Sequence, residues 1–556
     1  MKKFISFLFF CLFFYVISAQ TSTNTYWIHF KDKKESAYSL SSPSAYLSPK
    51  AIERRHKQNI SVTSSDLPVN ASYIQQIKDM DIRIVNQSKW FNAITIICSD
   101  INKINAIEKL PFVQEIMALT SSDQQIPSKF TAENNVVAVA DEIKDASSRS
   151  AALNYGLAYN QAHQINADCL HNFGFKGQGI TIAVMDAGFL DANTLPAFDS
   201  LRLNNQLLGT RDFITGDTLV FEDFSHGMNV LSCMGANLPG QMIGTAPKAN
   251  YWLLRTEDAG SETISEEISW AVGAEFADSV GADIINSSLG YNFFNNSADN
   301  HTYADMDGNT TIVTRAADIA ASKGIAVVSS AGNYGGPPWY KITAPADADS
   351  VLTVGAVDST GMIASLSSRG LTFDGRVKPD IVARGLQAVI AVNGGSISTS
   401  SGTSFSAPII AGAVACLWQA NPTATNMEII DAIRKSASQF NTPDSIKGYG
   451  IPDFCAASTI LTGIEKQELK GSQLNVHPNP FQDNFSLTFY SDKQQSVTVE
   501  LYDITGNKIT KQQRNVSSNS YTTFQPFETN ILSNGLYILH LVASDKEYYR
   551  KLIKHK

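Results

Sequence analysis

The strongest constraint on the fold comes from four continuous apolar runs that alternate with helix-type segments in the middle of the chain. The runs occupy residues 180–185, 282–290, 324–332 and 351–357. Their apolar residues follow one another instead of alternating with polar ones, so each run predicts a strand buried on both faces. Buried strands separated by helices are typical of a mostly parallel sheet with helices on both sides. Residues 153–462 are therefore predicted to form a three-layer α/β domain.

The segments on either side of this domain have different patterns. Residues 20–119 mix strand and helix signals, including a helix that opens at Ser48-Pro49, since serine is a good N-cap and proline fits the first helical position. We expect a small α+β unit there. After residue 466 the helix signals end and alternating strand patterns predict a small β-sandwich over residues 466–556. Residues 120–152 are polar and rich in small residues, as is typical of an exposed linker.

Residues 1–19 have the pattern of an export signal. Lys2 and Lys3 precede an apolar run of about fifteen residues that ends in Ser18-Ala19, which together describe a secretory signal peptide. A membrane anchor is the alternative, but it needs roughly twenty apolar residues. We therefore expect residues 1–19 to direct export and to be removed.

Composition and charge narrow the classes of function. The chain of 556 residues carries 43 Lys and Arg against 52 Asp and Glu, a formal net charge of −9. This balance argues against a nucleic-acid binder, which would carry a basic surface. A hydrophobic content of 43% excludes wholesale disorder. We therefore expect a globular protein with no nucleic-acid partner.

One of the six cysteines lies in the export signal, and the other five show no CxxC pair and no zinc-like spacing. Cys169 and Cys455 flank the α/β domain, so a disulfide that closes this domain is one hypothesis. Cys233 and Cys416 lie in helical runs of small apolar residues, where a buried free thiol is expected.

Three segments of the α/β domain carry residues suited to nucleophilic catalysis. Asp186 ends the first buried strand, and ligand sites in open α/β sheets form beyond such strand ends. His226 begins a segment of small residues, and Ser404 stands between a glycine-containing turn and an apolar helix. Pro408 is expected near the first turn of that helix, where a missing N–H has no consequence. Each residue alone is more often structural, as a cap or turn residue.

In the chain order Asp186, His226, Ser404, these residues match one arrangement of a catalytic triad, whereas other triads have the orders His-Asp-Ser or Ser-acid-His. His226 would accept the proton of Ser404, and Asp186 would hold the imidazole in the required tautomer. Asn333 follows another buried strand and offers an amide to an oxyanion, together with the backbone N–H of Ser404. The set therefore predicts a serine nucleophile that attacks an acyl carbon.

At these residues the chain resembles the subtilisin-like serine peptidases (subtilases). In that family the motifs DxG, HGxxV, GTSxSxP and AGN mark the aspartate, histidine, serine and oxyanion asparagine. They stand here at residues 186–188, 226–230, 402–408 and 331–333. The related sedolisins use Glu in place of His, so His226 argues against them. Met228 occupies a position where many subtilases have Thr, but it lies outside the triad and activity is expected to persist.

The resemblance also implies a substrate site. Ser288, Leu289 and Gly290 would line the cleft and pair with an extended polypeptide by strand addition. Residues 343–347 would form the far wall of the primary pocket, with a simple loop as the alternative. Subtilases often bind calcium, so a structural calcium ion is compatible with the resemblance. No acidic loop is dense enough to name its ligands, and no metal ligand is predicted.

The flanking units fit an exported precursor. Residues 20–119 resemble the subtilase propeptide, a ferredoxin-like module that assists folding and blocks the cleft, and cleavage is expected in residues 120–152, near Arg149. The tail resembles the C-terminal sorting domain of the type IX secretion system, and a carbohydrate- or partner-binding β-module is the alternative. Its motifs stand at residues 477–480, 503–506, 534–537 and 551–556.

The sequence thus predicts a secreted serine endopeptidase that is made as a zymogen and acts through an acyl-enzyme intermediate. The expected partners are extended polypeptide substrates, the chain's own propeptide as an intramolecular inhibitor, and the secretion machinery. Export through the periplasm to the cell surface or the extracellular space follows from the same resemblance. The alternative is a catalytically inactive surface-binding protein or adhesin with the same fold, and the intact Asp186, His226, Ser404 and Asn333 weigh against it.

Overall fold

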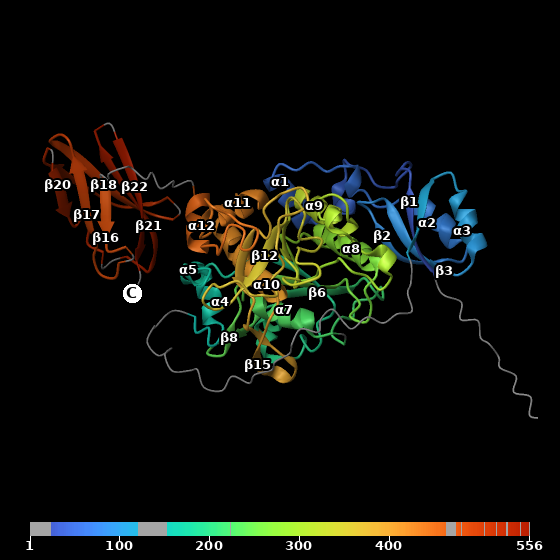
Figure 1. Ribbon diagram of the computed structural model, residues 1–556. Coiled ribbons are helices and arrows are strands. Elements are labelled where there is room, and N and C mark those ends of the chain that lie inside the picture. The colour runs from blue at the N-terminus through green and yellow to red at the C-terminus, as the bar shows by residue number, and fades with distance from the viewer. Residues whose placement is uncertain are drawn as a thin grey trace, which may run out of the picture.

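The computed structural model describes residues 24–119, 153–462 and 474–554, which we call the N-terminal, central and C-terminal units (Figure 1). Within these ranges it leaves out residues 223, 480, 505, 519, 530, 531 and 545. The predicted export signal and linker, residues 1–19 and 120–152, lie outside the described residues.

The central unit is built on one seven-stranded sheet with the order β13-β12-β11-β10-β5-β9-β6. Neighbouring strands in it are parallel throughout. The strands are β5 (Thr181–Asp186), β6 (Leu207–Asp212), β9 (Asn250–Arg255), β10 (Ile284–Ser287), β11 (Ala326–Ser330), β12 (Leu352–Val357) and β13 (Ile381–Arg384). The four apolar runs of the sequence correspond to β5, β10, β11 and β12, which confirms the predicted parallel sheet.

Helices cover both faces of this sheet (Figure 1). Ile182 and Val184 of β5 belong to a core on one face, which also contains α7 and α10. Ala183 and Met185 of the same strand belong to a core on the other face, with α8 and α9. Because successive side chains of a strand point to opposite faces, one apolar run supplies both cores. The helices of this unit are α4 (Tyr159–His163), α5 (Ala167–Asn172), α6 (Asp199–Leu203), α7 (His226–Gly235), α8 (Ile264–Val280), α9 (Ile312–Ser322), α10 (Thr403–Ala420), α11 (Asn426–Ser436) and α12 (Phe454–Leu461).

Two short hairpins complete the central unit, β7 (Asn237–Leu238) with β8 (Met242–Ile243) and β14 (Ala388–Ala391) with β15 (Ile397–Ser400). α10 packs both on the strands β10–β13 and on α7. Its length and apolar composition would suit a membrane span, but 89% of it is buried inside the protein. The hydropathy of α10 is therefore explained by its place in the core.

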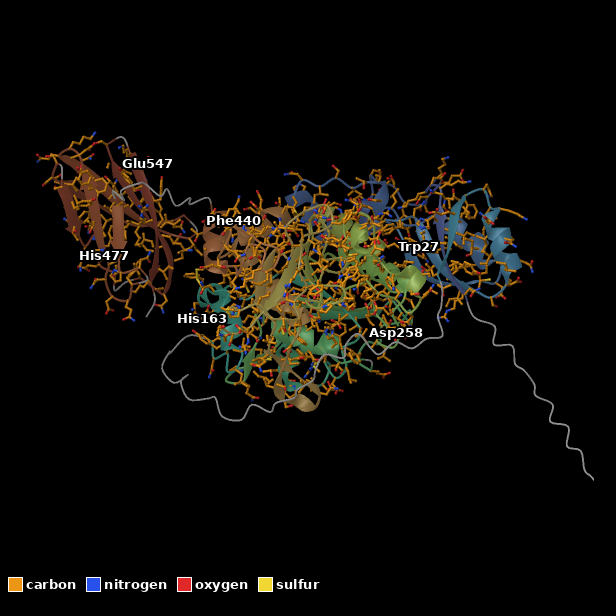
Figure 2. All side chains as sticks on the ribbon, in the orientation of Figure 1. Trp27, His163, Asp258, Phe440, His477 and Glu547 are labelled. Atoms are coloured by element: carbon orange, nitrogen blue, oxygen red, sulfur yellow. A yellow bond between two sulfur atoms is a disulfide. The ribbon has the colours of Figure 1, made fainter. Side chains whose placement is uncertain are left out.

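The N-terminal unit has a four-stranded antiparallel sheet with the order β2-β3-β1-β4. Its helices α2 and α3 pack on one face of the sheet. The other face, with Trp27 and Leu119, contacts Ile264, Ile268 and Ile312 of the central unit. Figure 2 labels Trp27 where the N-terminal unit meets the central unit. The unit consists of β1 (Asn24–Phe30), α1 (Pro49–Lys57), α2 (Ala71–Lys78), β2 (Arg83–Ser88), β3 (Ala93–Cys98), α3 (Ile101–Glu108) and β4 (Val113–Leu119). This confirms the predicted ferredoxin-like unit, to which α1 is an addition that packs on α8.

The C-terminal unit is a sandwich of two antiparallel sheets, β16-β17-β20 and β19-β18-β21-β22, around one hydrophobic core. Its strands are β16 (Leu474–His477), β17 (Ser486–Ser491), β18 (Gln495–Asp503), β19 (Lys508–Val516), β20 (Ser520–Phe524), β21 (Gly535–Ala543) and β22 (Lys546–Lys554). The Asn479 amide donates to the carbonyl of Lys551 at 2.6 Å and accepts from the N–H of Ile553 at 2.8 Å. Asn479 therefore links the first sequence motif of the tail to its basic last strand.

A disulfide joins Cys169 of α5 to Cys455 of α12, with an S–S distance of 2.04 Å. The bridge connects the two ends of the central unit, as hypothesised from the sequence. Cys233 and Cys416 are buried free thiols, as expected, and so is Cys98.

Glu275 of α8 is buried where the N-terminal unit packs on the central unit. Its carboxylate accepts hydrogen bonds from Ser88 Oγ at 2.5 Å, from Lys89 N at 2.7 Å and from Trp90 N at 3.1 Å. Burial raises the pKa of Glu275 to about 7. In the unfolded chain the pKa of a glutamate is about 4.3, so folding binds a proton between these values.

We expect the free energy of unfolding of the wild type to fall relative to that of Glu275→Gln as the pH rises from about 4.5 to about 7.5. The stabilising term of a group with a raised pKa is complete below the unfolded-state pKa and is lost as the pH passes the folded-state value. The differential change should be roughly 1–3 kcal/mol, read from urea titrations at each pH. Glu53→Gln, at an exposed position, is the control, and parallel curves for the wild type and Glu275→Gln would contradict the prediction.

Candidate active site

Asp186 is the last residue of β5, and its side chain is fully buried. Its Oδ1 atom accepts a hydrogen bond from Ala187 N at 2.8 Å and lies 2.8 Å from His226 Nδ1. A carboxylate held in this way selects the imidazole tautomer with the proton on Nδ1 and directs Nε2 away from the aspartate. The structure therefore brings together the first two predicted residues, which are 40 positions apart in the chain.

The contact between α7 and the turn after β5 depends on glycine. The N–H of Gly227 donates to the carbonyl of Gly188 at 3.0 Å. A Cβ atom at position 227 would lie 2.5 Å from that carbonyl oxygen and 2.8 Å from the Cβ of Asp186. Both distances are shorter than side-chain atoms tolerate, so only glycine lets the histidine at the start of α7 approach the aspartate. This explains why a glycine follows His226 in the sequence.

Ser404 is the second residue of α10, and Pro408 is the sixth, one turn later than the first-turn position expected from the sequence. That prediction was wrong because α10 begins at Thr403. Proline has no N–H, so the carbonyl of Ser404 receives no hydrogen bond from position 408. The hydroxyl of Ser288 donates to this carbonyl instead, at 2.8 Å, and Ser404 Oγ lies 3.3 Å from the carbonyl oxygen of Ser288.

Asn333 lies in the loop after β11, and its orientation is set by the start of α10. Its Oδ1 atom accepts from both the N–H and the hydroxyl of Thr403, each at 2.9 Å. The amide NH₂ group is therefore directed away from Thr403. It lies 3.4 Å from where a Cβ of Gly402 would stand, so glycine leaves the space before it open. Sequence reasoning missed this role of Thr403, although the residue belongs to the GTSxSxP motif.

The starts of α7 and α10 lie next to each other. Phe405 follows Ser404, and its ring centre is 5.9 Å from that of His226. The histidine and the serine thus stand at neighbouring helix N-termini above the carboxyl ends of the strands. The two chain neighbours of Ser404 thus contact the other predicted residues: Phe405 lies beside His226, and Thr403 donates to Asn333.

Comparison with known proteins agrees with this geometry. A family model described as the subtilase family matches residues 177–450. Subtilisin E of Bacillus subtilis (strain 168) is 30% identical over 306 residues, 54% of this chain and 70% of that protein. Subtilisin of Bacillus pumilus is 31% identical over 279 residues, 50% of this chain and 90% of that protein.

The chain belongs to the subtilase family. Serine protease AprX of Bacillus subtilis (strain 168) is a further relative, 30% identical over 304 residues, 49% of this chain and 65% of that protein. Two other family models match the flanking units: a peptidase S8 propeptide domain of Bacteroidota over residues 25–134 and a secretion system C-terminal sorting domain over residues 475–555. The protein is therefore a serine endopeptidase of the secreted type, made with a propeptide and with a type IX sorting domain.

The segment expected to bind substrate in this subtilase follows β10. Leu289 is buried, and Gly290 lies so close to the Thr343 hydroxyl that any side chain at position 290 would overlap it. The Thr343 hydroxyl is buried and has no hydrogen-bond partner among the described residues. Tyr291 and Ala344 form an antiparallel bridge, with N···O distances of 2.8 and 3.2 Å. Residues 288–290 and 343–347 are therefore packed against each other, and of these residues only Gly290 is partly exposed.

Asp347, at the end of the second segment, has a structural environment. Its carboxylate accepts from Thr314 Oγ1 at 2.6 Å and from Gly308 N at 2.9 Å. Burial raises its pKa to about 6. The side chain thus stabilises the loop against α9, and it does not provide a charge for substrate recognition.

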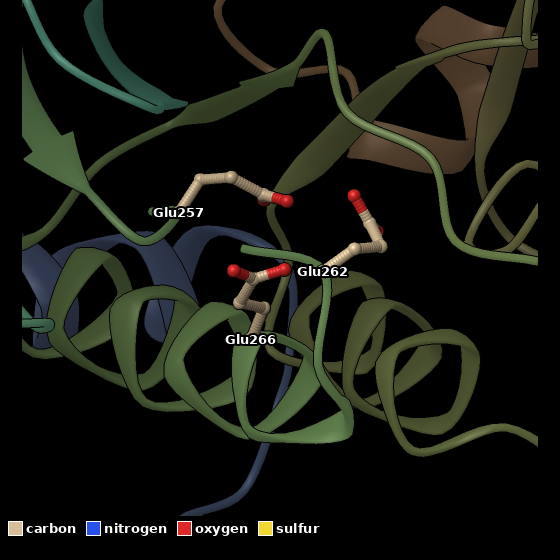
Figure 3. Close-up of side chains that lie close together, drawn as sticks. All are labelled: Glu257, Glu262 and Glu266. Atoms are coloured by element: carbon tan, nitrogen blue, oxygen red, sulfur yellow. The ribbon is translucent and has the colours of Figure 1, made fainter. Parts of the chain in front are cut away.

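Three buried glutamates that sequence reasoning did not single out, Glu257, Glu262 and Glu266, converge in the central unit (Figure 3). One oxygen of each lies within 4.8 Å of the others, and carboxylate oxygens are ligands that Ca²⁺ prefers. Protein donors also bind them: Tyr291 donates to Glu257 at 2.7 Å, and Ser261 donates to Glu266 at 2.9 Å. The cluster connects Tyr291, next to the expected substrate segment, to the start of α8.

Ser288→Ala should lower both stability and turnover. The substitution removes the donor to the Ser404 carbonyl, which Pro408 cannot replace, and leaves a buried acceptor unpaired at a cost of about 1–3 kcal/mol in unfolding free energy. We expect kcat to fall by about ten-fold or more, since the nucleophile is no longer held in register.

The measurements are thermal denaturation and the hydrolysis rate of a chromogenic peptide. Ser322→Ala, which removes a hydroxyl bonded to the Ile319 carbonyl within α9, is the control. A Ser288→Ala enzyme with unchanged kcat would show that the bond between Ser288 and Ser404 does not position the nucleophile.

Proposed function

We propose that this subtilase cleaves peptide bonds through a triad of Asp186, His226 and Ser404 and an acyl-enzyme intermediate. The observation that carries the proposal is the 2.8 Å contact between Asp186 and His226 beside a serine at the start of α10. In the acylation step His226 Nε2 accepts the proton of Ser404 as its Oγ attacks the substrate carbonyl. The protonated imidazole then donates to the leaving amine, and the same residue activates water for deacylation.

The oxyanion of the tetrahedral intermediate would be bound by two donors. The N–H of Ser404 is among the first four of α10, which have no acceptor within the helix and lie at the positive end of its dipole. The second donor is the NH₂ group of Asn333, whose orientation is fixed by the two hydrogen bonds from Thr403. Such prearranged donors act most strongly where charge develops in the transition state.

Substrate would bind as an extended polypeptide along Ser288, Leu289 and Gly290. The segment follows β10 directly, and we expect it to pair with the substrate backbone by strand addition. Gly290 keeps the surface before Thr343 free of side-chain atoms.

The precursor organisation we propose follows the expected boundaries. Residues 1–19 direct export into the periplasm, residues 20–119 act as the inhibitory propeptide, and cleavage in residues 120–152 frees the peptidase at 153–462. Residues 466–556 carry the enzyme across the outer membrane to the cell surface or the medium. The matches of the propeptide and sorting-domain models support this order.

Labelling with a fluorophosphonate tests the triad. The wild type should be labelled at Ser404 after propeptide removal, and Ser404→Ala should not be labelled and should accumulate as uncut precursor. Asn333→Ala should keep the reactive serine while kcat falls by about 10²–10³-fold, because one oxyanion donor is lost. A wild type that folds but takes no label would instead support the inactive binding protein, and normal processing of Ser404→Ala would assign maturation to another protease.

Deletion of residues 475–556 tests the sorting assignment. The truncated enzyme should be retained in the periplasm in active, disulfide-bonded form, because Cys455 and the whole central unit are kept. Fractionation followed by immunoblotting measures its location. Unchanged secretion of the truncated enzyme would refute the role of the tail. Asn479→Ala, which breaks the link between the first motif and β22, should also reduce export.

A further inference from the structure

Helix α1 of the N-terminal unit binds the subtilase domain at the amino ends of the parallel strands, opposite the candidate active site. Its contacts include residues that precede β5, β10 and β11, whereas the candidate catalytic residues follow the carboxyl ends of these strands. Since the strands are parallel, their amino ends share one edge and their carboxyl ends the other. This surface is therefore separate from the candidate active site.

One face of α1 carries polar groups that reach the subtilase domain. Lys50, Arg54 and Gln58 are four positions apart, so they lie on the same side of the helix. Lys50 Nζ donates to Asp283 Oδ2 at 2.7 Å, and Gln58 Nε2 donates to the carbonyl of Gly324 at 2.8 Å.

Arg54 is buried and caps two helix ends of the subtilase domain. Its guanidinium donates to the carbonyl of Lys323, the C-cap residue of α9, at 3.1 Å, and to that of Ala282, just after α8, at 2.5 Å. Carbonyls at helix C-termini lack intrahelical donors and favour positive charge. Gly281 permits this approach, because a Cβ there would lie 2.7 Å from the Cβ of Lys50.

Buried charges alternate across the same contact. Asp278 of α8 is fully buried and pairs with Arg54 at 2.5 Å, Arg55 at 2.9 Å and Lys89 at 3.2 Å, all from the N-terminal unit. Arg55 also pairs with Asp66 at 2.7 Å, and Asp66 in turn lies 3.3 Å from Lys323 of the subtilase domain. Each side thus supplies both acidic and basic partners.

We propose that residues 48–66 are an anchor that keeps the N-terminal unit on the subtilase domain, independently of the cleft, after the connecting chain has been cut. The docking surface consists of Asp278, Lys323 and the carboxyl ends of α8 and α9. Its partner is a short helix that presents Lys50, Arg54 and Gln58, four positions apart, with a second arginine, Arg55, beside the middle one. Truncation of a buried, hydrogen-bonded charge pair acts mainly on dissociation, so this anchor sets how long the propeptide stays bound.

Release of the unit can be measured without peptidase activity. A full-length Ser404→Ala chain with a site-specific protease site placed in residues 120–152 is immobilised through its C-terminus and cut with that protease. The N-terminal unit that appears in the wash is followed with time. Because no step needs Ser404, a failed triad assignment leaves this experiment valid.

The double variant Arg54→Gln/Arg55→Gln should dissociate at least about thirty-fold faster than its parent. Glu53→Gln/Lys57→Gln is the matched control, since these side chains of the same helix are 59% and 55% exposed and contact each other. It should dissociate as the parent does.

Asp278→Asn makes the same test from the subtilase side if the arginine variant does not fold. Combined with Arg55→Gln, its effect should be smaller than the product of the two single effects, because both substitutions break one contact. Equal dissociation of the parent, the arginine variant and Asp278→Asn would overturn the proposal, and so would immediate loss of the parent's N-terminal unit after the cut.

Discussion

The parallel pairing of β11, β10 and β5 is the constraint on which the candidate active site depends. Asp186 ends β5, Ser288 follows β10 and Asn333 lies in the loop after β11. Neighbouring strands in a sheet are about 4.8 Å apart, so residues beyond the ends of three adjacent strands are held within roughly 10 Å of each other. A carboxylate, a buried hydroxyl and an amide therefore meet although 147 positions separate the first from the last. One helix layer, that of α7 and α10, adds the imidazole and the nucleophile.

Two small departures from regular structure place those helices. Gly227 removes the side chain that would hold α7 away from the turn after β5. Pro408 removes one hydrogen bond from α10, and the Ser404 carbonyl that it leaves is bound by Ser288. Gly227 lacks the Cβ atom that would clash with the turn after β5. Pro408 lacks the N–H that would otherwise bind the Ser404 carbonyl in place of the Ser288 hydroxyl. These contacts explain why a glycine directly follows His226 and why a proline stands four residues after Ser404.

Much of the fold and most of the candidate site follow from local sequence. The runs that became β5, β10, β11 and β12 are apolar throughout, and the resemblance to subtilases supplied Asp186, His226 and Ser404 from short motifs. The start of α10 was misplaced because the sequence around Gly402 does not distinguish a helix from its preceding turn. The contacts of α1 were invisible because Arg54 and Asp278 are 224 positions apart. The cluster of Glu257, Glu262 and Glu266 was missed for a related reason, since a loop folds back on a helix start.

Helix α8 runs from the side of the sheet at the carboxyl ends of the strands to the side at their amino ends. Its 17 residues span about 25 Å, from the glutamate cluster beside the expected substrate segment to Asp278 at the anchor. The N-terminal unit contacts it through Ile264 and Ile268 in the first half, and through Glu275 and Asp278 in the second half. Leu119, the last described residue before the linker, belongs to the first of these contacts. The described chain of the unit thus ends near the start of α8, while α1 binds near the end of that helix. Because α1 contacts the domain far from this point, the proposed anchor predicts that cleavage after β4 and dissociation of the unit are separate steps.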